Sequence, residues 1–217
     1  MGFHRLKYKK KTRQDMIDLS TQFMNVMATR RSVRGFSNED IPDIVLENII
    51  RTAMSAPSGA NKEPWQFSVV KDKTVKKKIR KAAEEEEKKF YKERATEEWL
   101  KDLNKFETDW RKPFLEKAPA LIVVFRQSYD NRGGLKRKNY YVGESVGIAS
   151  GFLITAIHNA GLTSLTHTPS PMGFLEKILE RPSNEKAFLI IPVGYPEPNT
   201  QVPMLKKRRY KDTVRIY

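Results

Sequence analysis

RRSVRGFSNEDIPDIVLENIIRTAMSAPSGAN, residues 30–61, decides the interpretation of this chain. The stretch opens with three guanidinium groups and one hydroxyl, those of Arg30, Arg31, Ser32 and Arg34. The planar arginine fork matches phosphate oxygens in a bidentate way, so this segment suits a phosphate monoester. A basic helix end that complements the helix dipole would have the same composition.

The rest of that stretch predicts a helix followed by a loop of small residues. Pro42 suits the first turn of a helix, and apolar residues follow it at helical spacing as far as Ala53. The helix then ends at the loop Pro57, Ser58, Gly59 and Ala60. Small residues around a proline bend let backbone amides approach a flat ligand closely, although an ordinary helix end with a glycine stop explains them equally well.

Further along the chain, strands are embedded among longer helices. Period and length predict helices over residues 13–29, 72–95, 141–159 and 172–179, and strands over 66–70, 120–125, 163–166 and 187–193. The run ALIVVF at 120–125 is typical of a strand buried on both faces. This order favours an α+β fold over a doubly wound one, in a single domain spanning residues 1–217.

Composition excludes several classes of site. The chain has no cysteine and three histidines, so disulfides, thiolate chemistry and a histidine-based metal centre are not expected. Its formal net charge of +15 attracts anions, but no aromatic-interleaved module accompanies the basic runs, and no nucleic-acid partner is expected. No secretory signal or membrane span is apparent, which predicts a cytoplasmic protein.

Taken together, the motifs resemble the nitroreductase family. RRSVRGFS, APSGAN, PWQFSVV, GIASGFLITAIHNAGL, THTP, RPSNEK and PVGYP follow one another in that family's order, over roughly residues 20–212. The resemblance implies a mixed sheet surrounded by helices, an intertwined homodimer and FMN as cofactor. It also implies cofactor-binding roles for Arg30, Arg31, Ser32, Arg34, Pro57, Ser58, Gly59, Thr166 and Thr168, and a substrate-binding role for Ala60.

The middle of the chain resembles one branch of that family, the iodotyrosine deiodinases. Glu87 and Tyr91 lie four residues apart on one helical face, and Lys112 follows 21 residues after Tyr91. A carboxylate, a phenol and an ammonium would form a receptor for an amino-acid zwitterion, beneath a charged lid of about residues 96–113. A frame shifted by one residue, which pairs Glu86 with Phe90, loses the phenol.

Two other segments take roles from the resemblance. Thr168 aligns with a hydroxyl that donates to the flavin N5 and favours one-electron chemistry, whereas His167 departs from the Thr-rich segment of the deiodinases and is interpreted as a packing or surface residue. In the basic tail of about residues 200–217, spacing to Asp212 selects Arg208 for the FMN phosphate, and Lys207 fits if no insertion is assumed.

The resemblance therefore implies FMN-dependent reductive dehalogenation of iodotyrosine to tyrosine and halide. Because no Gly-x-Gly-x-x-Gly follows a strand, NAD(P)H would have to use the substrate face of the flavin, or a partner reductase would replace it. The alternatives are a broad nitro- or quinone reductase, a flavin-fragmenting benzimidazole synthase of the same superfamily and, in another class, a non-catalytic basic nucleic-acid-binding protein.

Overall fold

The computed structural model describes residues 2–217, and its backbone contacts divide the chain into two compact units, residues 1–30 and residues 31–217. The first unit contains α1 (Arg13–Ala28), which begins at a capping box in which Thr12 and Asp15 bond each other's backbone amides. None of the residues of α1, all of which are described, is buried. Phe23 is 54% exposed and Met24 60%.

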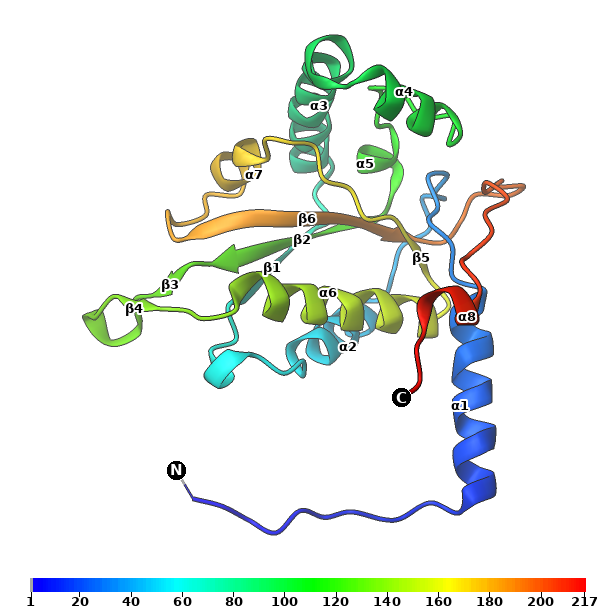
Figure 1. The fold of residues 1–217 in the computed structure, drawn as a ribbon. Helices are drawn as coiled ribbons and strands as arrows, with labels where there is room; N and C mark the ends of the chain where they lie inside the picture. The colour runs from blue at the N-terminus through cyan, green and yellow to red at the C-terminus, as the bar shows by residue number, and fades with distance from the viewer. Residues whose placement is uncertain (1) are drawn as a thin grey trace. The chain divides into compact units, whose positions relative to one another are not determined.

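The second unit is built around a four-stranded sheet in the order β1-β2-β6-β5 (Figure 1). Its strands are β1 (Trp65–Val70), β2 (Ala120–Gln127), β5 (Thr163–Ser164) and β6 (Glu185–Gly194). All three pairings are antiparallel, which corrects the expectation of a mixed sheet. Among residues 2–217, parallel pairing is confined to an isolated bridge between Ser32 and Ser164. Helices lie in the connections between the successive strands of this sheet.

Strand β2 forms the centre of the core, as its unbroken apolar run predicts. All six residues from Ala120 to Phe125 are 0% exposed. Because side chains alternate across a strand, Ala120, Ile122 and Val124 belong to one hydrophobic cluster and Leu121, Val123 and Phe125 to the other. The sheet is therefore covered on both faces.

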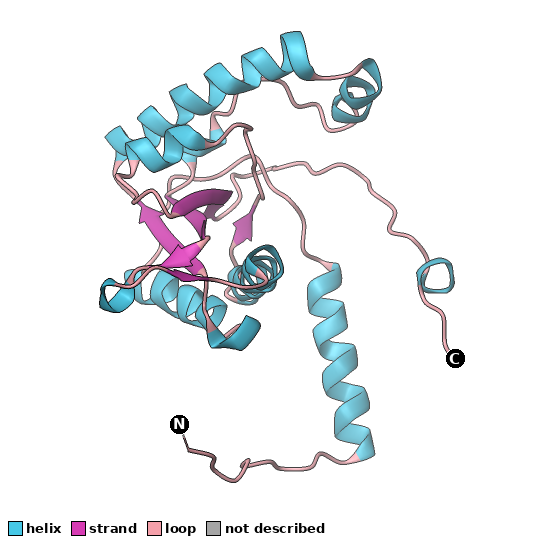
Figure 2. Cartoon of the chain, turned by 60° about the vertical axis from the view of Figure 1, so that its left-hand side comes forward, coloured by secondary structure: helices cyan, strands magenta, loops and turns pink. Residues whose placement is uncertain are grey.

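Helices form the two covering layers, which lie on opposite sides of the strands in Figures 1 and 2. One layer contains α2 (Asp43–Met54) and α6 (Val142–Asn159), and the other contains α3 (Lys73–Lys89), α5 (Phe114–Lys117) and α7 (Gly173–Ile178). On α3 the buried apolar residues are Ile79 and Ala83, which belong to the hydrophobic cluster on that face of the sheet. The α+β architecture is thus confirmed.

The segment after α3 is packed differently from the sheet. A π-helical turn (Phe90–Arg94) extends α3, and α4 (Glu97–Asn104) follows from an N-cap in which Thr96 accepts a hydrogen bond from the amide of Trp99. No residue of α4, which the structure describes in full, is buried, and Trp99 is 54% exposed. Residues 96–113 therefore form a loosely packed layer, called the cover below.

The chain also contains short elements that the periodicity did not indicate. These are a 3-10 turn (Gly59–Asn61), the hairpin of β3 (Tyr129–Asp130) and β4 (Arg137–Lys138), the 3-10 turn between them (Arg132–Gly134) and α8 (Tyr210–Thr213). They are too short, and the hairpin too charged, to carry a hydrophobic period. The longer predicted helices and strands are confirmed to within a few residues, except that the strand at 163–166 is reduced to Thr163–Ser164.

Candidate functional site

The candidate site is a cavity of about 470 Å³ between the cover, α3 and the segment before α7. Six of the residues singled out in the sequence line it: Arg34, Glu87, Tyr91, Lys112, Thr166 and Thr168. The remaining lining consists of Glu86, Phe90, Trp99, Leu103, Thr108, Phe114, Leu165, His167, Ser170 and Met172. The cavity thus combines a few charged groups with an aromatic and aliphatic wall, which is the usual composition of a small-molecule site.

An ion pair lies at the centre of this cavity. The Nζ of Lys112 is 3.3 Å from Oε2 of Glu87, and the two side chains are 4% and 12% exposed. Lys112 also donates through Nζ to the carbonyl oxygen of Asp109, and its backbone amide donates to Oε1 of Glu84 over 2.7 Å. Glu87 and Lys112, two of the residues predicted to hold a zwitterion, therefore contact each other.

Burial changes the pKa of each partner in the direction that favours its neutral form. Loss of water raises the pKa of Glu87 above its ordinary value, and the charge of Lys112 offsets part of that rise. Loss of water likewise lowers the pKa of Lys112, against the charge of Glu87. Breaking a buried pair by removing one partner is costly, so a ligand entering here must supply opposite charges of its own.

Tyr91 links the ion pair to the cover. Its hydroxyl donates to the carbonyl oxygen of Thr108 over 3.2 Å, and its ring lies 5.5 Å from the Nζ of Lys112. The neighbouring ring of Phe90 packs edge-to-face against Trp99 of α4, with centroids 4.9 Å apart. Through these contacts, the helix that carries Glu87 also positions the aromatic residues of the cover.

The adjacent carboxylate, Glu86, has different partners. Its side chain pairs with Lys89 at 3.0 Å and with Arg94 at 3.4 Å, both of them exposed cations. Glu87 instead pairs with the buried Lys112. Of the two possible pairs, only Glu87 and Tyr91 include a carboxylate with a buried ionic partner. Glu86 and Phe90 line the cavity as well.

His167 enters the cavity from the segment between β5 and α7. Its backbone amide and carbonyl both bond to Ile190 of β6 at 2.9 Å, and its ring packs edge-to-face on Phe114 with centroids 5.3 Å apart. Burial and the charges of Lys112 and Arg34 lower the pKa of His167 to about 3, so the ring is neutral at physiological pH. The interpretation as a packing residue is correct in part, but His167 is not a surface residue, since its side chain is 11% exposed.

The arginine-rich segment is only partly gathered at the cavity. Arg34 lines it half-buried, with its pKa lowered by burial, whereas Arg31 donates to the carbonyl oxygen of Pro203. Ser32 bridges to Ser164 at the end of the sheet. Arg30 belongs to the other compact unit of the chain, residues 1–30.

The loop Pro57–Ala60 lies outside the cavity lining. The amide of Gly59 donates to Oγ of Ser145 at 3.4 Å, and a Cβ on Gly59 would approach the ring of Tyr141 to 2.8 Å. Ala60 has a left-handed backbone with φ of 50°. Glycine is therefore required at 59 by a close contact with the start of α6.

Thr166, Thr168 and the basic residues of the C-terminal tail are exposed. Thr166 and Thr168 are both exposed at the edge of the cavity, on either side of the inward-facing His167. Arg208 is exposed and lies outside the cavity lining, as does Lys207. The backbone of Pro203, which Arg31 contacts, connects this tail to the arginine-rich segment.

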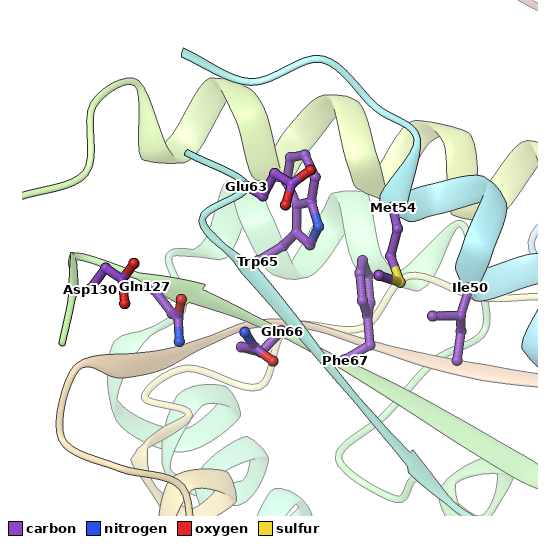
Figure 3. Close-up of a pocket in the computed structure, with 8 residues that line it drawn as sticks. All are labelled: Ile50, Met54, Glu63, Trp65, Gln66, Phe67, Gln127 and Asp130. Carbon is purple, nitrogen blue, oxygen red and sulfur yellow. The ribbon is translucent and has the colours of Figure 1, made fainter. Parts of the chain in front are cut away.

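A second hollow of about 340 Å³ lies along β1 at the opposite edge of the sheet from β5 (Figure 3). It is lined by Ile50, Met54, Glu63, Trp65, Gln66, Phe67, Gln127 and Asp130. None of the residues predicted from the sequence to bind a ligand is among them. One of its polar residues, Gln127, already donates to Oε1 of Glu185 over 3.1 Å.

Two further features are absent from residues 2–217, the part of the chain that the structure describes. Within that range no group of three or more His, Asp or Glu side chains is placed to hold a metal ion. In the same part of the chain, no helix is both long enough and apolar enough to cross a membrane.

Comparison with known proteins identifies the family. The model of the nitroreductase family matches residues 27–195. An iodotyrosine deiodinase of Haliscomenobacter hydrossis is 56% identical over 205 residues, which cover 94% of this chain and 92% of that protein. The chain belongs to the nitroreductase family and, within it, to the iodotyrosine deiodinases. Human iodotyrosine deiodinase 1 is 46% identical over 90% of the chain and 68% of its own length.

A solved iodotyrosine deiodinase has the same fold. Its crystal structure, in the oxidised state and bound to FMN and 3-iodo-L-tyrosine, superposes with a TM-score of 0.75 at 34% identity. The match covers 87% of this chain and 98% of that one. The family resemblance found in the motifs is thereby confirmed, and the nucleic-acid-binding alternative loses its basis.

Proposed function

We propose that this protein is an FMN-dependent iodotyrosine deiodinase that converts iodotyrosine to tyrosine and iodide. The observation that carries the proposal is the buried pair of Glu87 and Lys112 inside an aromatic-lined cavity, in a chain 56% identical to an iodotyrosine deiodinase. A plain nitroarene has no charges that would justify burying such a pair. An amino-acid zwitterion has one charge for each partner.

Substrate binding is an exchange of ion pairs. The ammonium group of iodotyrosine pairs with Glu87 and its carboxylate pairs with Lys112, so two ion pairs replace one. The phenol of Tyr91 lies beside both groups and provides a third polar contact. A ligand with only one of the two charges would leave Glu87 or Lys112 buried without a partner, which costs about 3–5 kcal/mol for a buried pair.

The cover closes over the bound substrate. Lys112 lies at its C-terminal end and Tyr91 bonds its Thr108, so both zwitterion contacts are coupled to its position. Trp99 of α4 packs on Phe90, and no residue of α4 is buried. Binding energy from the zwitterion therefore orders the cover and excludes water from the site, which makes the reaction dependent on the correct substrate.

The residues present fit FMN. Arg34 is half-buried and, among the described residues, has no carboxylate within ion-pair distance, so its charge is available for an anion. Thr168 presents an exposed hydroxyl at the cavity edge, suited to donate to the flavin N5. Arg30, Arg31, Ser32 and Arg208 would complete the phosphate contacts. Reduced FMN supplies the two electrons which, with one proton, replace iodine by hydrogen on the ring and release iodide.

We further propose that the site is completed by a second copy of the chain in an intertwined homodimer. The loop Pro57–Ala60 is assigned to FMN and substrate but lies outside this cavity. On α6 one face is open, because a Cβ at Gly143, Gly147 or Gly151 would meet nothing within 4 Å. Ile148 and Phe152 on that helix are 43% and 39% exposed. Such an apolar face without side chains in the way suits a helix of the partner subunit.

Electrons come either from NAD(P)H at the same flavin face or from a partner reductase. The net charge of +15 favours an acidic protein as the latter. The competing function within the family is broad nitro- or quinone reduction, which needs only an open flavin face and no zwitterion receptor.

The proposal is tested by purifying the protein and measuring its visible spectrum and iodide release. We expect a yellow protein with bound FMN that releases iodide from 3-iodotyrosine after chemical reduction. Arg34→Ala should weaken FMN retention. The matched control is Arg126→Ala, at an exposed position near the C-terminal end of β2. A protein that neither carries nor takes up FMN, or that reduces nitroarenes but releases no iodide, contradicts the proposal.

A further inference from the structure

The cavity contains a polar atom without a partner. Nε2 of His167 is buried and makes no hydrogen bond with any described residue. Oε1 of Glu87 lies 3.9 Å from this atom, while Oε2 of the same carboxylate faces Lys112 at 3.3 Å. The two oxygens of Glu87 thus face different side chains, one a cation and the other an imidazole.

The ring of His167 is held in this place from two sides. Both backbone groups bond to Ile190 on the central strand β6, which fixes where the side chain leaves the chain. The edge-to-face contact with Phe114 then fixes the plane of the ring. Oε1 of Glu87, at 3.9 Å, is too far from Nε2 for a hydrogen bond, and a small shift of the carboxylate would bring it to that distance.

We infer that His167 is a positioning residue. Its Nε2–H lies 3.9 Å from Oε1 of Glu87, outside hydrogen-bond distance while Oε2 faces Lys112, and donates to Oε1 once Lys112 turns to the substrate, so that the carboxylate is held for the ammonium group of the substrate. The inference rests on the proposed function. A carboxylate can only accept hydrogen bonds, so the nitrogen that faces it carries the proton. The neutral tautomer with Nε2–H meets that need without adding a charge.

The neutral state matters because of the other charges around the pair. Lys112 faces Glu87 from the end of the cover, Arg94 from the end of the helix that follows α3, and Arg34 from the N-terminal arginine segment, with Tyr91 and Asp109 nearby. A charged imidazolium would compete with the substrate ammonium for Glu87. Burial, Lys112 and Arg34 keep the pKa of His167 far below neutrality and so prevent this competition.

The role of His167 becomes essential once the ion pair exchanges. When Lys112 turns to the substrate carboxylate, Glu87 loses its strongest partner within the protein. The ammonium group replaces Lys112 at one oxygen, and the Nε2–H of His167 donates to the other. Without that donor, the buried Glu87 favours its protonated form, because burial already raises its pKa.

The direct test is a nitrogen-15 NMR measurement of the side-chain nitrogens of His167 in the FMN-loaded protein. With three histidines in the chain, His4→Gln and His158→Gln variants assign the signals. We expect a neutral ring with its proton on Nε2 from pH 5 to 8, and a shifted Nε2 signal in Glu87→Gln. A proton on Nδ1 instead, or titration near pH 6.5, overturns the inference whatever the enzyme does with iodotyrosine.

The functional test compares His167→Phe, which keeps the ring packing but removes the donor, with His167→Gln, which keeps an N–H. We expect His167→Phe to raise the KM for iodotyrosine roughly tenfold, as loss of one hydrogen bond to a charged group predicts, and to move the acidic limb of kcat/KM to higher pH. His167→Gln should recover most of the affinity. Equal losses in the two variants, or an unmoved acidic limb, contradict the role.

The two proposals fail in different ways. A wild-type protein that binds FMN but releases no iodide contradicts the proposed function, while the NMR result still stands or falls on its own. Iodide release with normal KM and an unshifted pH profile in His167→Phe contradicts the positioning role alone.

Discussion

Strand β2 and the cover are opposite extremes of packing within one small protein. The six residues Ala120–Phe125 are completely buried between two helical layers, whereas α4 of the cover has no buried residue and leaves Trp99 54% exposed. Yet the cover ends at Lys112, which is 3% exposed and central to the cavity. The difference teaches that the sheet stabilises the fold, while under the proposed function substrate specificity would depend on the loosely packed cover.

The largest expected effect separates the two regions by stability. Ile122→Ala removes methylene groups from a site with 0% exposure, and should lower the free energy of unfolding by about 2–5 kcal/mol. Leu103→Ala in the cover should cost less than about 1 kcal/mol, because its site is half-open and can relax. Urea denaturation of the FMN-loaded variants measures both. Equal losses at the two positions would show that the cover is part of the cooperative core.

The next prediction concerns protection of the cover by ligand. Trypsin cleavage at Lys101 and Lys105 requires the cover to open, so saturating iodotyrosine at 100 times its Kd should slow that cleavage by up to about 100-fold. The basic residues Lys206–Arg209 of the tail provide the control within the same chain, since they are exposed and lie outside the cavity. Their cleavage should be unchanged, and equal protection at both places would point to global stabilisation instead.

A smaller effect is expected from pH. The pKa of His167 is about 3 in the folded protein against an ordinary 6.5, so the unfolded chain binds a proton here that the folded chain excludes. This contribution to stability is present above pH 6.5 and is lost progressively as pH falls toward 3. Between pH 7 and pH 5 the loss should be about 2 kcal/mol.

His167→Phe is the matched variant for that measurement. It should remove the same share of the pH dependence. Urea titrations at pH 7 and pH 5 decide the matter. A pH dependence that is identical in wild type and His167→Phe contradicts the burial of a neutral imidazole.

The sequence was sufficient for the elements whose packing is periodic. The apolar run at 120–125 predicted a strand covered on both faces, and the small-residue helix at 141–159 is α6. What it could not indicate was strand direction: the sheet is antiparallel, because direction depends on how the connections return and not on the residues within each strand. The hairpin of β3 and β4 was missed because two-residue strands have no period.

The same distinction between what the sequence predicted and what it missed applies to the site. The resemblance to the deiodinases predicted one site for Glu87, Tyr91 and Lys112, which line one cavity, and helical spacing placed Glu87 and Tyr91 on one helix face. It did not reveal that Glu87 and Lys112 pair with each other, that Arg34 joins them, or that His167 turns inward. These facts depend on contacts between segments far apart in the chain. The cover folds back over α3, the ring of His167 packs on Phe114, and the backbone of His167 bonds to Ile190.

The most direct test of the zwitterion receptor is the turnover of iodotyrosine by Lys112→Ala, compared with Lys105→Ala at an exposed position of the cover. Loss of a hydrogen bond between charged groups is worth about 1.5–3 kcal/mol, so kcat/KM for iodotyrosine should fall roughly 10- to 150-fold in Lys112→Ala. Iodophenol and nitroarene turnover should hardly change, and Lys105→Ala should match wild type throughout. If Lys112→Ala lowers iodotyrosine turnover no more than nitroarene turnover, the buried pair has no part in recognising the substrate, and the account of this site is wrong.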